Sequence, residues 1–194
     1  MGELIFLEPV LKETIWGGSR IGQFGVSLPS DHVGELWAVC AHANGDNKIT
    51  QGRFAGFTLG SLWNSHPELF GEDSSCRRNF PLLTKILDAR DDLSIQVHPD
   101  DQYAAANENG SLGKTEHWYI LDAEPGTTIV IGHNASDSEQ VRQMIEGRRW
   151  NEFIRQIPVK KGDSFFIEPG TVHAIKGGTL ILETQQSSDI TYRV

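Results

Sequence analysis

Gln96 and His98 stand two residues apart in the run 93–101, whose first half is rich in apolar and β-branched residues. Side chains two apart on a strand project from the same face, so an amide oxygen and an imidazole could reach one ion. Taken alone, such a pair is more often a partly buried polar pair that is hydrogen-bonded to its neighbours. A metal site therefore needs further ligands from elsewhere in the chain.

A second pair, Lys114 and Glu116, opens the next strand-like run. Its spacing places an ammonium and a carboxylate on one face of the strand, while His117 points to the other face. By itself a Lys-x-Glu pair is typical of a solvated surface. The pair becomes informative only if another part of the chain brings metal ligands to it.

A third run, residues 162–174, has a more specific pattern. A Gly-Asp turn leads into an apolar strand, a Pro-Gly turn follows at Pro169 and Gly170, and His173 comes three residues after this glycine. Glycine and proline at such positions are strong turn signals. The run resembles the second cupin motif, in which strand, turn and histidine deliver a metal ligand into the mouth of a small β-barrel. Its proline stands one place later than in the usual motif.

The residues that correspond to the first cupin motif depart from its common pattern, which is His-x-His followed by Glu. Here the chain has Gln96-x-His98 followed by Glu116. In this respect it is similar to the type I mannose-6-phosphate isomerases, whose metal ligands are a glutamine, a histidine, a glutamate and a second histidine. The resemblance implies that Gln96, His98, Glu116 and His173 bind one zinc ion per chain.

The resemblance extends over nearly the whole chain. It includes Trp-Gly-Gly at 16–18, Gly-Glu-Leu-Trp at 34–37 and Gln-Val-His-Pro-Asp-Asp at 96–101, and residues 188–193 match the family's strand with the catalytic arginine. Bacterial members of the family continue with further β structure after this point. We therefore expect that the family's C-terminal β region is absent here and that residues 1–194 form a single cupin-type catalytic domain.

The ligand types fit zinc on chemical grounds as well. Two imidazoles, a carboxylate and an amide oxygen suit Zn²⁺, and the same set could accept Co²⁺, Mn²⁺, Ni²⁺ or Fe²⁺. The two cysteines, Cys40 and Cys76, lack a CxxC spacing, which argues against a thiolate site. The remaining histidines are not expected to bind the metal. His32, His42 and His66 lie in polar, turn-like surroundings, His117 points away from Glu116, and His133 lacks a second ligand two residues away.

The family resemblance implies an aldose–ketose isomerase that interconverts mannose 6-phosphate and fructose 6-phosphate through a cis-enediol. Such a reaction needs a Lewis acid and fixed cations to stabilise the enediolate. We expect Arg193 to stabilise the developing oxyanion, Lys114 or Asp189 to assist proton movement, and Glu183 to be a further candidate base. Arg20, Ser94 and Lys114 are candidates for the phosphate contact.

Two other functions use the same barrel. A non-catalytic, metal-binding cupin could act as a sugar sensor or binding module, and an iron-dependent cupin oxygenase would prefer a set of three ligands. The fourth ligand, together with Lys114 and Arg193, argues against the oxygenase. An isomerase assay separates an enzyme from a binding module.

The elements that must position these residues are mostly strands. Short runs rich in β-branched and aromatic residues, separated by turn signals, favour an antiparallel sandwich or barrel, and the fold class is mainly β. These runs are 35–39, 93–97, 117–121, 127–131, 164–167 and 178–184. Apolar residues near a 3.6 period predict helical insertions at 58–70 and 136–157, the second capped by Ser136 or Asp137.

Composition limits the classes of partner. The net charge of −9 disfavours nonspecific binding to nucleic acid or anionic lipid, because both require a basic face. No apolar stretch approaches the roughly 20 residues that span a bilayer, and the first eight residues lack the features of a signal peptide. We expect a cytoplasmic protein that acts on a small phosphorylated hexose, with a monomer favoured.

Overall fold

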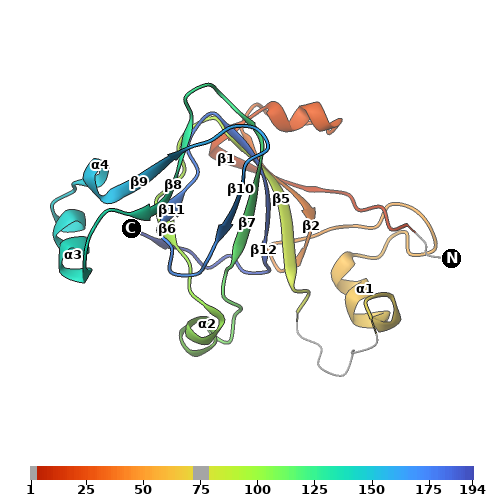
Figure 1. Cartoon of the computed structure of the whole chain (residues 1–194). Helices are drawn as coiled ribbons and strands as arrows, with labels where there is room; N and C mark the ends of the chain where they lie inside the picture. The colour runs from red at the N-terminus through yellow and green to blue at the C-terminus, as the bar shows by residue number, and fades with distance from the viewer. Residues whose placement is uncertain (1–3, 72–78) are drawn as a thin grey trace.

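Two antiparallel sheets form the body of the protein (Figure 1). The computed structural model describes residues 4–71 and 79–194, so Cys76 lies outside the described residues. The larger sheet has six strands in the order β1 (Val10–Gly18), β2 (Val33–Val39), β5 (Leu82–Ala89), β12 (Thr179–Gln186), β7 (Glu116–Ala123) and β10 (Ser164–Ile167).

The smaller sheet faces the larger one. Its five strands follow the order β13 (Tyr192–Arg193), β6 (Gln96–Val97), β11 (His173–Ala174), β8 (Thr128–His133) and β9 (Ile154–Pro158). A separate hairpin consists of β3 (Ala41–His42) and β4 (Gly45–Asp46). The predicted mainly β class and antiparallel pairing are thus confirmed.

Strand β7 of the larger sheet alternates between an inner and an outer face. In β7, Glu116, Trp118 and Ile120 are buried, whereas His117 and Tyr119 are exposed. This period of two is the signature of a strand with one face on a core. The main apolar core lies between the sheets and comprises Leu87, Ala89, Trp118, Ile120, Ile129, Val159, Ile167, Ile175 and Ile181. Buried polar residues continue the same inner face beyond this core and form the candidate site.

The helices lie outside the two sheets (Figure 1). The predicted helical segment 58–70 appears as α1 (Leu59–Ser65), capped by Thr58, followed by the 3-10 turn η2 (Pro67–Leu69). Two helical elements were not expected from the sequence, the 3-10 helix η1 (Arg20–Phe24) and α2 (Asp101–Asn107), and strands β1 and β5 also lie outside the predicted runs. Helix α2 starts where the carboxylate of Asp100 accepts the N–H of Tyr103 at 2.7 Å.

The prediction of helix throughout 136–157 was wrong in its second half. Helix α3 (Ser138–Glu146) begins after Asp137, whose carboxylate accepts the N–H of Gln140, as one of the two predicted caps. The chain then turns through Arg148, which has φ 52°, into the single turn α4 (Trp150–Phe153). Residues Ile154–Pro158 are strand β9, because pairing with β8 outweighs the helical period of the apolar residues.

The motif Trp-Gly-Gly at 16–18 reflects close contact between backbones. A Cβ on Gly17 would lie 2.4 Å from the backbone nitrogen of Gly34 and 2.6 Å from the carbonyl oxygen of His32. Neither atom can rotate away, since both belong to the main chain. The motif therefore has a structural role at the junction of β1 and β2.

We expect Gly17→Ala to lower the free energy of unfolding by about 2 kcal/mol, the cost of overpacking a close contact. Urea denaturation followed by tryptophan fluorescence measures this change. Gly22→Ala is the matched control, because its Cβ would meet only the side chain of Leu28 at 3.4 Å. Equal stability of the two variants would contradict the close contact at Gly17.

None of the described helices is long and apolar enough to cross a membrane. Cys40 is fully buried, and burial raises the pKa of its thiol to about 11. A protonated, inaccessible thiol is a poor metal ligand, which agrees with the expected absence of cysteine from the site.

Candidate metal centre and adjoining cavity

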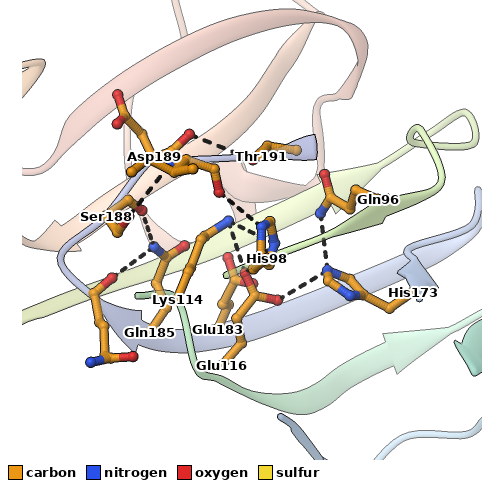
Figure 2. A network of polar contacts seen from close by, with 12 residues as sticks. Gln96, His98, Lys114, Glu116, His173, Glu183, Gln185, Ser188, Asp189 and Thr191 are labelled. Atoms are coloured by element: carbon orange, nitrogen blue, oxygen red, sulfur yellow. Dashed lines mark hydrogen bonds and ion pairs between the residues drawn. The ribbon is translucent and has the colours of Figure 1, made fainter. Parts of the chain in front are cut away.

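Three of the four predicted ligands converge at one point between the sheets. One ligand atom from each of His98, Glu116 and His173 lies within 4.8 Å of the others, and all three residues are buried. Figure 2 shows the three side chains pointing toward one another. His98 follows β6 directly, and His173 is paired with Gln96 across β11 and β6. Antiparallel pairing thus joins ligands that are distant in sequence.

Hydrogen bonds to backbone carbonyls fix both imidazoles. The Nδ1 atom of His98 lies 2.9 Å from the carbonyl oxygen of Ile190, and that of His173 lies 2.8 Å from the carbonyl oxygen of Thr171. A carbonyl oxygen only accepts, so each Nδ1 carries the hydrogen. Each Nε2 lies near Glu116, at 3.2 Å for His98 and 3.6 Å for His173, and Nζ of Lys114 lies 3.1 Å from Nε2 of His98. This orientation by carbonyl groups is typical of metal-binding histidines.

Gln96 borders the same point. Its side-chain amide nitrogen is placed 3.2 Å from Nε2 of His173. A half-turn of the amide exchanges its nitrogen and oxygen without moving the rest of the side chain. Gln96 can therefore present an oxygen to a cation, as the sequence predicts.

The carboxylate of Glu116 is held between positive and metal-ligating groups. Its Oε1 lies 2.9 Å from Nζ of Lys114 and 3.2 Å from Nε2 of His98, yet it accepts no well-oriented hydrogen bond from the described residues. Burial opposes ionisation, but the charge of Lys114 holds the pKa of Glu116 well below its usual range. Burial also lowers the pKa of His173 to about 4.

These residues fit a divalent cation. Two neutral imidazoles and an ionised carboxylate with an unused oxygen lie close together, and the donor types are those that zinc prefers. The same oxygen and lone pairs would be costly to bury without a partner. The geometry therefore supports a metal centre formed by His98, Glu116 and His173.

A cavity of about 620 Å³ adjoins this centre. Its lining includes all four predicted catalytic residues as well as Gln96 and Ser94. The predicted catalytic residues are Lys114, Glu183, Asp189 and Arg193. The volume is ample for a small phosphorylated sugar. Arg20, by contrast, is absent from the lining, and its guanidinium binds Asp88 at 2.7 Å and the carbonyl oxygen of Thr179 at 2.6 Å. It is not available as the expected phosphate contact.

Glu183 belongs to a row of buried charges on the floor of the cavity. Lys85 Nζ lies 3.0 Å from Glu183 and 3.4 Å from Glu35. Burial and the nearby Glu116 raise the pKa of Glu183, while Lys85 opposes this shift. Burial disfavours the charge of Lys85, but the carboxylates of Glu183 and Glu35 outweigh this effect and raise the pKa of Lys85.

Lys85 and Glu35 were missed in the sequence analysis. A charged residue at an inward position of an apolar strand was the available signal, because Leu83 and Leu87 flank Lys85 at a spacing of two. The register that pairs Glu183 with Lys85 cannot be read from either strand alone.

The structure places Arg193 and Asp189 differently from the buried residues. Arg193 is exposed, lines the cavity and pairs with Gln96 through β13 and β6. The side chain of Asp189 is 56% exposed, and its carboxylate accepts a hydrogen bond from the amide of Asn44 at 2.7 Å. Figure 2 shows Asp189 at the margin of the network.

No other histidine joins the metal-binding group among residues 4–71 and 79–194. His133, at the end of β8, stacks on Phe153 with ring centroids 5.4 Å apart. His117 lies on the exposed face of β7 and contacts Ser164 at 2.7 Å. Both have the non-ligand positions that the sequence predicts.

The two facing antiparallel sheets and the enclosed His/Glu/His group define a cupin-type fold with a candidate metal centre. Residues 4–152 match the family model described as phosphomannose isomerase type I, catalytic domain. The chain belongs to this family, as its motifs predict.

Known relatives agree with this assignment. The chain is 53% identical to mannose-6-phosphate isomerase ManA of Bacillus subtilis over 192 residues, which is 99% of this chain and 60% of the relative. It is 50% identical to mannose-6-phosphate isomerase of Streptococcus mutans, covering 100% of this chain and 61% of that protein. The chain thus spans about three fifths of the length of these relatives.

Solved structures show the same fold. The crystal structure of mannose 6-phosphate isomerase from Bacillus subtilis superposes with a TM-score of 0.93 at 48% identity, over 97% of this chain and 60% of that one. A mannose 6-phosphate isomerase bound with zinc and yttrium has a TM-score of 0.74 at 16% identity, over 97% and 69% of the two chains. The second likeness supports the fold alone.

Proposed function

We propose that this chain is the catalytic part of a zinc-dependent mannose-6-phosphate isomerase, in which residues 1–194 form one cupin-type domain. The observation that carries the proposal is the buried group His98, Glu116 and His173 beside a cavity lined by lysine, arginine and carboxylate side chains. Family membership supplies the substrates, mannose 6-phosphate and fructose 6-phosphate.

We assign the metal ligands as Gln96, His98, Glu116 and His173, with one zinc per chain. A zinc ion held there would supply a Lewis acid that polarises substrate oxygen atoms. The cavity-facing position of Gln96 leaves the centre accessible from the cavity.

The remaining residues are assigned by what the isomerisation requires. A base removes the proton from C2 of the aldose, and the C–H electrons form the C1–C2 double bond of a cis-enediol while the electrons of the C1–O1 double bond move to O1. The C2–O2 carbonyl then forms as a proton is delivered to C1. Glu183 is the candidate for this carbon-to-carbon transfer, because its raised pKa suits a group that both accepts and returns a proton. The O2 proton must move to O1, and Lys114 or Asp189 at the cavity assists that transfer.

Arg193 is assigned to the developing oxyanion. A guanidinium stays charged at every working pH and offers a rigid set of donors. The exposed position of Arg193 in the cavity lining allows it to meet a substrate that enters from solvent.

Metal removal tests the proposed function. Purified protein should convert mannose 6-phosphate to fructose 6-phosphate in an assay coupled to formation of glucose 6-phosphate. Treatment with a chelator should abolish turnover, because the substrate oxygen atoms lose the Lewis acid that polarises them. Added Zn²⁺ should restore turnover. A zinc-loaded protein that binds mannose 6-phosphate without turnover would establish the alternative, a non-catalytic sugar-binding module.

Solvent labelling tests the route of the hydrogen. If a side chain carries the proton between C2 and C1, product formed in deuterium oxide should contain deuterium at C1 of fructose 6-phosphate. Mass spectrometry or proton NMR measures the label at partial conversion. Complete absence of label at every pH and conversion would instead favour direct hydride transfer.

A further inference from the structure

Trp118 lies between two acidic side chains of the candidate site. Its indole Nε1 is 3.1 Å from Oε2 of Glu116 and 2.8 Å from Oε1 of Glu183. The side chain is fully buried, and its ring contacts that of His173 edge-on with centroids 5.5 Å apart. One indole thus touches two proposed metal ligands and the candidate base.

Strand register produces this arrangement. Glu116 and Trp118 are two residues apart on the inner face of β7, and Trp118 pairs with Glu183 on the neighbouring strand β12. The indole N–H faces one oxygen of each carboxylate, Oε2 of Glu116 and Oε1 of Glu183. Glu183 and Glu116 lie side by side in the network of Figure 2.

The two carboxylates share a common pattern of contacts. In Glu116, Oε1 faces Lys114 and Oε2 faces the indole; in Glu183, Oε2 faces Lys85 and Oε1 faces the indole. Two buried anions repel each other strongly in a medium of low dielectric constant. A donor shared between them lowers that cost and fixes the separation of the two groups.

We propose that Trp118 is a positioning residue that ties the metal ligand Glu116 to the proton-transfer residue Glu183. Its N–H holds Glu116 in the orientation that binds zinc, and the same N–H holds Glu183 toward the cavity. The effect on turnover rests on the proposed function, whereas the effect on zinc binding does not. Groups that orient metal ligands in this way change metal affinity by about 10–100-fold when they are removed.

Trp118→Phe is the first test, since it keeps an aromatic ring and removes the N–H. We expect zinc to leave the variant about tenfold faster than it leaves the unmodified protein, measured with a chromogenic chelator in the absence of substrate. In the coupled assay, kcat should fall about tenfold or more while KM changes little. Thermal unfolding of the same samples shows whether the fold is retained.

Two tryptophans serve as controls. Trp37→Phe removes an indole N–H that binds the cavity carboxylate of Glu35 at 2.6 Å but reaches no metal ligand, so zinc release should be unchanged. Trp150→Phe truncates a ring in the separate cluster near α4, and it should leave both zinc release and turnover unchanged. A folded Trp118→Phe protein with the zinc release and kcat of the unmodified protein would overturn the proposal.

A measurement on the unmodified protein decides the question if Trp118→Phe does not fold. With ¹⁵N-labelled tryptophan, the indole signal of Trp118 can be assigned by elimination with Phe variants of the other four tryptophans. Zinc added to the metal-free protein should shift the Trp118 signal more than those of Trp37 and Trp150. A Trp118 signal that zinc does not move overturns the proposal, and an inactive but zinc-binding chain would reject only the proposed function.

Discussion

His98→Ala and His173→Ala should each lose zinc and turnover together. Each change removes one of two neutral imidazoles whose Nε2 atoms lie near Glu116, and it leaves the carboxylate of Glu116 buried with one ligand fewer beside it. We expect zinc content to fall from one per chain to near zero in dilute zinc. Turnover should fall by roughly a thousandfold, or about 4 kcal/mol of barrier, because the Lewis acid is lost.

Elemental analysis of dialysed protein gives the zinc content, and the coupled assay gives the turnover. His133→Ala is the matched control, because this imidazole stacks on Phe153 away from the centre. It should keep both zinc and activity. Stoichiometric zinc in both His98→Ala and His173→Ala would show that the ion binds elsewhere.

Arg193→Ala should leave zinc content and folding nearly intact while it lowers kcat by roughly a hundredfold, the scale of losing one stabiliser of transition-state charge. The alternative for an exposed arginine is a surface ion pair, which contributes at most about 1 kcal/mol to stability and nothing to rate. The described residues form no ion pair with Arg193, whereas the side chain lines the cavity. The geometry thus favours a role in catalysis.

A lysine at position 193 tests whether the positive charge alone supports the rate or whether the planar guanidinium is needed. Arg193→Lys keeps the positive charge but loses the planar pair of donors, so we expect it to recover little of the lost rate. Arg155→Ala is the control for an exposed arginine. The guanidinium of Arg155, in β9, donates to the carbonyl oxygen of Ile131 in the neighbouring strand β8. Near-normal turnover of Arg193→Ala would remove this residue from the mechanism.

The structure brings together three of the four predicted ligands, His98, Glu116 and His173. The local spacing of each motif was a weak signal by itself, and the family resemblance supplied the link between them. The charged row that includes Lys85 and Glu35 depends on pairing between strands that are far apart in sequence. Its members therefore emerge only once the register of the sheet is known.

The strands were predicted in part. Runs rich in β-branched and aromatic residues marked β2, β7, β8, β10 and β12, whereas β1, β5 and β9 were not among the expected runs. Ile154 and Ile157 are three residues apart, which fits one face of a helix, yet pairing with β8, with a register shift between Val130 and His133, makes the segment a strand. In 93–97, only Gln96–Val97 is a strand, because the partner β11 is two residues long.

The most direct test of the account is diffraction from crystals of the zinc-loaded protein at energies on both sides of the zinc absorption edge. The account predicts one strong anomalous peak per chain, about 2.0–2.2 Å from Nε2 of His98, Nε2 of His173 and a carboxylate oxygen of Glu116. The amide oxygen of Gln96 should complete the set. A zinc peak at any other place, or no peak between these side chains in crystals of active protein, would contradict the proposed centre.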